Sequence, residues 1–145
     1  MKNNKGFTLI ELLAVIVILA IIALIATPTI LGVVEDARKG AAESSLLGWI
    51  DAVEKQGMIN ELDETATNYT DGTYTVTATG IKDPDNHDIK VGVKGQRPDA
   101  GATFTIHGGE ITGTPEFKVG KYYVTYNASE GKAVANTSSQ AASAS

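Results

Sequence analysis

The feature that most constrains this sequence is a run of 23 residues without a charged side chain, from Leu12 through Val34. As an α-helix such a run extends for roughly 35 Å, which exceeds the hydrocarbon core of a bilayer at about 30 Å. Lys2 and Lys5 precede it, and positive charge before a first apolar segment favours a cytoplasmic position for that end. The run therefore predicts a membrane helix, with the following chain on the outer side.

One acidic residue, Glu11, stands at the start of this run. The eleven Leu, Ile and Val residues between Leu12 and Ile25 favour insertion by roughly 3 to 7 kcal/mol. A carboxylate costs about 2.5 to 3.5 kcal/mol at the membrane centre, and Glu11 lies near the end of the helix, so insertion is still favoured. Either Glu11 reaches the headgroups, or a positively charged partner compensates it.

A cleavable secretory signal is the alternative interpretation of this segment. Such a signal has a shorter apolar region that ends at small residues beside a cleavage site. Here the apolar run passes Ala26, Thr27 and Pro28 and then continues, which favours a retained helix. Pro28 removes one helical hydrogen bond and crowds the carbonyl of Leu24, which predicts either a bent, continuous helix or a locally melted turn.

Two patterns follow the apolar run. From Ile30 to Val53 the apolar residues recur every three or four positions, as on one face of an amphipathic helix, and Gly57 is a stop signal for that helix. Farther on, alternation with period two predicts short strands. The expected strands are residues 73–79, 89–93, 103–107, 110–112 and 122–126, with a hairpin turn at residues 108–109. One antiparallel sheet covering the helix gives an α+β fold.

The composition divides the chain into five segments. These are a leader (residues 1–6), a hydrophobic membrane and assembly segment (7–34), the amphipathic half of the helix (35–62), a globular β-sheet head (63–132) and a Ser/Ala-rich tail (133–145). The tail has no core-forming pattern and is predicted to be disordered. The chain has no cysteine, so the head has neither disulfides nor thiolate metal ligands.

The N-terminal residues also carry a family resemblance. A basic leader, a Gly-Phe junction, an acidic residue and an apolar helix follow in order in Lys5-Gly6-Phe7-Thr8-Leu9-Ile10-Glu11-Leu12. This string resembles the processing and assembly signature of type IV pilins and their pseudopilin relatives. The resemblance implies that a prepilin peptidase cuts after Gly6 and methylates the new amino group of Phe7. It also implies a pilin-like fold, in which the long helix packs against a small antiparallel sheet.

The resemblance supplies a partner for Glu11. The methylated amine of Phe7 lies one helical turn away and is still protonatable, and in the family this pairing is taken to join neighbouring subunits. Two charges about 4 Å apart attract by about 1 kcal/mol in water but about 4 kcal/mol at an effective dielectric of 20, so the pair favours the assembled state. Pro28 resembles the helix-kinking proline of many pilins and is assigned to assembly with Phe7 and Glu11.

Other functional sites are sparse. A net charge of −5 with scattered Lys and Arg argues against nucleic-acid binding, and no nucleophile motif or phosphate loop indicates an enzyme. His87 and His107 lack the spacing of a metal pair. Asp83, Asp85 and Asp88 form an incomplete calcium pattern, because the glycine and the terminal glutamate of a twelve-residue calcium loop are missing. No other cofactor is expected.

These observations predict a membrane-stored subunit that is processed and then polymerises through its N-terminal helix into an extracellular filament. Its expected partners are further copies of itself, the prepilin peptidase, an inner-membrane assembly platform and the membrane. Two alternatives stay open at this point. One is a pseudopilin of a type II secretion or competence DNA-uptake machine, and the other is an unprocessed, membrane-anchored binding module.

Overall fold

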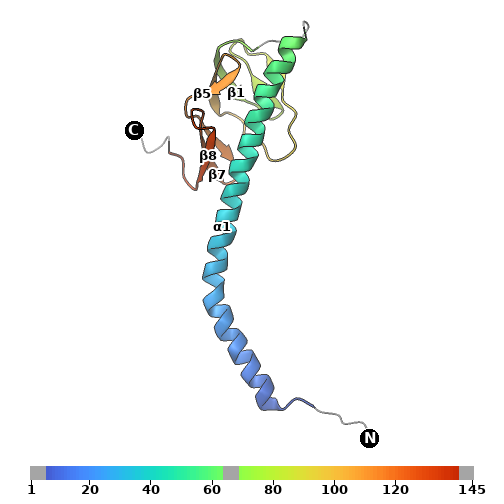
Figure 1. The fold of residues 1–145 in the computed structure, drawn as a ribbon, viewed down its shortest axis with the longest axis vertical. Coiled ribbons are helices and arrows are strands. Elements are labelled where there is room, and N and C mark those ends of the chain that lie inside the picture. Colours follow the sequence, from blue (N-terminus) through green and yellow to red (C-terminus); the bar gives the residue numbers. More distant parts are fainter. Residues whose placement is uncertain (1–5, 64–68, 141–145) are drawn as a thin grey trace. The chain divides into compact units, whose positions relative to one another are not determined.

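A single helix, α1 (Leu9–Leu62), contains 54 residues (Figure 1). It belongs to a computed structural model that describes residues 6–63 and 69–140. The chain divides into two compact units, residues 1–37 and residues 38–145. From here on, the head means the whole second unit, which includes the C-terminal part of the helix as well as the predicted β-sheet head. The helix is continuous through Pro28. Of the two alternatives predicted for this proline, the structure therefore has the continuous helix and not the locally melted turn.

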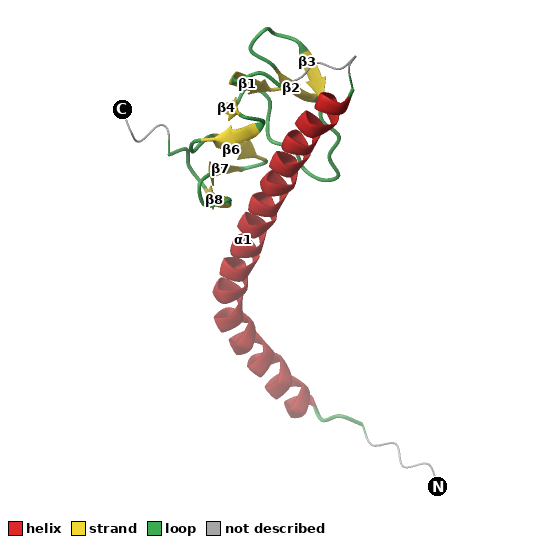
Figure 2. Ribbon diagram, turned by 45° about the horizontal axis from the view of Figure 1, so that its top comes forward, coloured by secondary structure: helices red, strands yellow, loops and turns green. Residues whose placement is uncertain are grey.

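Eight strands follow the helix in the chain and form two antiparallel sheets (Figure 2). The first sheet has the order β3-β2-β1-β4-β5 and the second has the order β6-β7-β8. The strands are β1 (Gly72–Val76), β2 (Gly80–Lys82), β3 (Asp88–Lys90), β4 (Thr103–His107), β5 (Glu110–Thr112), β6 (Glu116–Val119), β7 (Tyr122–Asn127) and β8 (Lys132–Asn136).

The predicted α+β class is confirmed, but the prediction of one sheet is wrong. Strands β4 and β5 have the predicted bounds, and the turn at Gly108 and Gly109 connects them, since His107 pairs with Glu110. The sequence reasoning missed β2, β6 and β8. Each of these strands pairs with neighbouring strands that lie elsewhere in the chain, and its own residues do not show this contribution.

The prediction that the tail is disordered is wrong for residues 133–136, which belong to β8. This strand pairs with β7, placing Ala133 opposite Tyr126, and Ala135 is buried in the core. The chain then returns to β6, where the Ser139 hydroxyl and the Gln140 N–H both donate to the carboxylate of Glu116. Small side chains are compatible with a strand here because the neighbouring strand and the helix supply the contacts. Residues 141–145 lie outside the described part of the chain.

Gly57 does not end the helix, which continues to Leu62. Instead Gly57 is buried beneath the ring of Tyr69, and a Cβ at this position would lie 2.7 Å from Cδ2 of that ring. The Tyr69 hydroxyl donates to the backbone carbonyl of Val53 at 2.9 Å. The glycine therefore allows close approach of an aromatic side chain, a role that local stop signals do not reveal.

Three aromatic rings join the helix to both sheets. Trp49 of α1 contacts Phe104 of β4 and Phe117 of β6, with ring centroids 5.6 and 5.4 Å apart. Phe104 and Phe117 also contact each other at 5.8 Å. All three side chains are at most 3% exposed. The core of the head is thus one continuous cluster under two separate sheets.

Two glutamates of α1 accept hydrogen bonds from edge strands of the sheets. Glu43 Oε1 accepts the N–H of Ala135 in β8 at 2.8 Å, and Glu54 Oε1 accepts the N–H of Ile111 in β5 at 3.2 Å. β5 and β8 are each the last strand of their sheet. The carboxylates therefore satisfy backbone donors that would otherwise be open to strand addition.

We expect Gly80→Ala to destabilise the head. Gly80 is buried in β2, and a Cβ there would overlap the backbone carbonyl of Ile89 in β3, so the two strands must separate. The expected loss of unfolding free energy is about 1 to 3 kcal/mol. Denaturant unfolding of the full chain in detergent, followed by fluorescence of Trp49, the only tryptophan, measures it. Gly92→Ala is the control, since a Cβ there meets nothing within 4 Å; equal stability of both variants would contradict the packing argument.

We expect Glu54→Gln to stabilise the head at neutral pH. Burial, together with the charges of Glu110 and Asp51, raises the pKa of Glu54 above its ordinary value, although the Ile111 N–H opposes this shift. The folded state therefore binds a proton more tightly than the unfolded state, and stability falls as pH rises from the ordinary glutamate pKa through the raised one. Gln keeps an acceptor for Ile111 and removes the partly buried charge.

The measurement is denaturant unfolding of both proteins at several pH values. The stability gain of Glu54→Gln is expected above the raised pKa and should shrink in acid. Asp36→Asn removes one negative charge from an exposed position in the interior of α1 and is expected to change stability by less than about 0.5 kcal/mol. A gain for Glu54→Gln that did not vary with pH would contradict the assignment.

Candidate functional site

The predicted cleavage junction lies in exposed, non-helical backbone. Gly6, Phe7 and Thr8 precede α1, which begins at Leu9, and the Phe7 side chain is 92% exposed. A peptidase acts on extended, accessible backbone, which a helix does not offer. The bond between Gly6 and Phe7 is therefore accessible, and the cut itself stays a prediction. The other leader residues, 1–5, lie outside the described part of the chain.

Glu11 has a hydrogen-bond partner that the sequence reasoning missed. The N–H and the hydroxyl of Thr8 each donate to Oε2 of Glu11 at 2.8 Å, and the N–H of Glu11 donates to Oγ1 of Thr8 at 3.3 Å. This reciprocal pair is a capping box, in which the residue before the helix and its third residue satisfy each other's backbone donors. The spacing Thr-x-x-Glu is the sequence signal that predicts it.

The capping box changes the role expected for Glu11. The carboxylate begins the helix within a single chain, so it is not an unsatisfied charge before assembly. In the structure the nitrogen of Phe7 is part of a peptide bond and carries no charge. Pairing with a methylated amine therefore requires the cut first, and it would compete with or add to the hydrogen bonds from Thr8.

The apolar half of α1 has no cover from its own chain. Every large apolar side chain from Phe7 to Val34 is exposed, and no part of the most apolar stretch of the helix is buried. By length and composition this is the one described helix that qualifies as a membrane span. Pro28 has no backbone N–H, so the helical hydrogen bond to the carbonyl of Leu24 is missing. The hydroxyl of the neighbouring Thr27 donates to the carbonyl of Ala23 at 2.6 Å. The helix nevertheless continues through Pro28.

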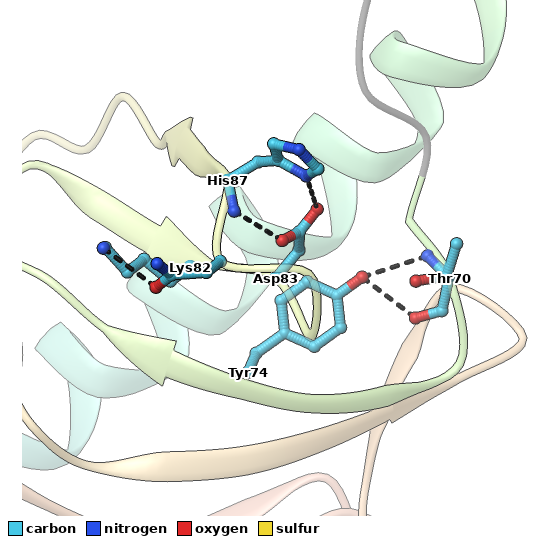
Figure 3. A network of polar contacts seen from close by, with 6 residues as sticks. Thr70, Tyr74, Lys82, Asp83 and His87 are labelled. Atoms are coloured by element: carbon cyan, nitrogen blue, oxygen red, sulfur yellow. Dashed lines mark hydrogen bonds and ion pairs between the residues drawn. The ribbon is translucent and has the colours of Figure 1, made fainter.

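The calcium candidates occupy the β2–β3 hairpin, where the structure gives Asp83 a different partner (Figure 3). Asp83 is only 8% exposed. Its Oδ1 accepts the backbone N–H of His87 at 2.7 Å, and its Oδ2 lies 3.0 Å from Nδ1 of the same residue. Burial alone would raise the pKa of Asp83, but the hydrogen bonds from His87 outweigh it, so the pKa lies below its ordinary value.

The three predicted calcium ligands are not grouped as expected. Potential ligand atoms of Asp83, Asp85 and His87 lie within 4.8 Å of one another, whereas Asp88 is exposed in β3 and pairs with Lys82 across the hairpin. With both oxygens of Asp83 already hydrogen-bonded, the loop is ordered by its own side chains. Calcium binding stays a prediction. His107 lies in β4, in agreement with the prediction of a loop or strand residue, and its Nδ1 lies beside Oδ2 of Asp71.

Two comparisons with known proteins find similarities to this chain, and one of them concerns the same N-terminal segment. A family model described as "Prokaryotic N-terminal methylation motif" matches residues 1–27. A curated relative, the type IV wide pilus major component PilA4 of Thermus thermophilus, is 40% identical over 83 residues. The N-terminal segment thus carries a prokaryotic N-terminal methylation motif, and part of the chain is similar to a type IV pilus component. The alignment covers 57% of this chain and 58% of that relative, and no solved structure matches the chain.

Proposed function

We propose that this chain is a type IV pilin, the structural subunit of a type IV pilus-like extracellular filament. It is held in the cytoplasmic membrane by the apolar half of α1, cut after Gly6 by a prepilin peptidase, and methylated on Phe7. An inner-membrane assembly platform then adds it to a surface filament of identical copies, which form contacts through their N-terminal helices.

The observation that carries this proposal is the uncovered apolar surface of the helix between Phe7 and Val34. Exposed apolar area on this scale is unfavourable in water, so either lipid or other helices must cover it. Lipid covers it before assembly, and the same segment of other subunits covers it in a filament. The methylation motif at the start of this helix, over residues 1–27, supports the same sequence of events.

A pseudopilin of a type II secretion or DNA-uptake machine is the alternative, since it has the same N-terminal motif. The relative named as the major component of a wide pilus favours the pilin. Electron microscopy of cells that express the chain separates the two: long surface fibres support a pilin, and their absence with a processed subunit supports a pseudopilin.

We expect the mature protein to begin with N-methylated Phe7. Mass spectrometry of the N-terminal peptide from a cell envelope fraction measures this directly. Gly6→Ala should leave the leader attached, because the peptidase recognises the residue before the cut. The structure has open space around Gly6, so this variant does not disturb folding. Normal trimming of Gly6→Ala, or an intact leader on the wild-type protein, would refute the proposed processing.

Variants of Glu11 separate its charge from its role at the helix start. Glu11→Gln keeps a side chain that completes a capping box with Thr8 but removes the negative charge. If the charge pairs with the Phe7 amine of another subunit, both Glu11→Gln and Glu11→Ala are inserted and processed but yield few fibres. Thr8→Val removes the hydroxyl partner and keeps the charge, so it should still assemble. Wild-type fibre yield from Glu11→Gln would show that the charge is not needed, and a low yield from Glu11→Ala beside it would then assign the effect to the helix cap.

A further inference from the structure

The end of α1 has an unusual combination of charge and exposed apolar surface. Met58, Ile59 and Leu62 are 62%, 56% and 88% exposed. Glu61 is exposed among them, and the last turn contains no basic residue. Because the negative end of the helix dipole lies here, an acidic residue at this position is unfavourable in an isolated chain. We call Met58, Ile59, Glu61 and Leu62 the helix end, and its chemistry suits a cationic partner with an apolar surface.

A groove on the same head has the opposite character. Its volume is about 340 Å³, and it lies between the beginning of the head helix and the turn that connects β6 to β7. It is lined by two cations, an amide and apolar side chains, contributed by Arg38, Ala41, Ala42, Gln96, Lys121 and Tyr122. Nζ of Lys121 lies 4.9 Å from the centroid of the Tyr122 ring. None of these lining residues is acidic, although Lys121 has a further contact in the chain.

We propose that the helix end of one subunit docks into this groove on a second copy of the chain. The opposite charges favour the encounter and oppose like-with-like pairing, while Leu62 and Met58 cover the apolar walls. Among potential occupants, a second copy is favoured because one chain carries both complementary surfaces. The inference rests on the proposed filament, in which copies of this head are held close together.

The positions of the two surfaces determine what kind of assembly results. Arg38 and Leu62 lie on one helix, and 24 residues at 1.5 Å each separate them by about 36 Å along its axis. A contact between two different surfaces is heterologous, so each added subunit leaves one helix end and one groove open. The contact therefore extends a row of heads, each displaced by about one head length, and does not close into a dimer.

Cysteine crosslinking of fibres tests this contact, because the natural chain has no cysteine. The full chain with Ala41→Cys and Leu62→Cys is assembled into fibres and treated with a short bismaleimide. We expect a ladder of covalent dimers, trimers and larger species on a denaturing gel. Co-assembly of the two single-cysteine chains should give dimers and nothing larger, since each chain then has one reactive surface. Monomers alone, from intact fibres of the double variant, would overturn the proposal.

The control places the second cysteine on the outer face of β4, with Thr103→Cys and Leu62→Cys, and should give no ladder. If wild-type cells make no fibres at all, the proposed filament function is wrong. If wild-type fibres form but the Ala41→Cys, Leu62→Cys variant gives no crosslinks, only the proposed groove contact is wrong.

Charge exchange provides a second measurement that does not depend on cysteine variants assembling. Lys121→Glu and Glu61→Lys are each expected to lower fibre yield about tenfold, and the double variant should recover most of it. Lys90→Glu, an exposed reversal in β3, should have no effect. A double variant that assembles no better than either single variant would overturn the charge pairing.

Discussion

The contact of Trp49 with Phe104 and Phe117 holds the head together. It is the place where the helix, the five-stranded sheet and the three-stranded sheet meet, with ring centroids 5.4 to 5.8 Å apart. Edge-to-face packing of such rings adds about 0.5 to 1.5 kcal/mol per pair beyond the burial of their area. In a chain without disulfides, this aromatic cluster joins elements that a covalent bridge joins in many small disulfide-bonded domains. The two glutamate contacts to β5 and β8 then tie the outer strands to the same helix.

The other half of the helix has the reverse problem. It supplies more apolar surface than its own chain covers, and its one charged residue is satisfied locally by Thr8. A segment of this kind is stable only when another hydrophobic environment surrounds it, which is the reason that the proposed membrane storage and the proposed polymerisation use the same residues. The chain therefore combines a head that completes its own core with a helix that depends on other molecules.

Sequence reasoning succeeded where the signal was long or local. The apolar run, the amphipathic stripe and the Gly108-Gly109 hairpin depend on residues close together in the chain, and all three predicted the right element. It failed where distant contacts decide. Gly57 has a stop signal, but Tyr69 packs on it, and residues 133–136 have no apolar pattern, but pairing with β7 orders them. At the candidate site, the Thr8–Glu11 box was predictable from its spacing and was overlooked.

What the sequence determined by itself is the long helix, its division into apolar and amphipathic halves, and the order of residues at the Gly6-Phe7 junction. These follow from periodicity and hydrophobicity, which act within a few residues of each other. Only the tertiary structure decided that the strands form two sheets, that Trp49 joins them, and that Glu43 and Glu54 bind strand edges. These features depend on contacts between residues far apart in the chain. Each such contact contributes little free energy, and many act together, so no local sequence pattern reveals them.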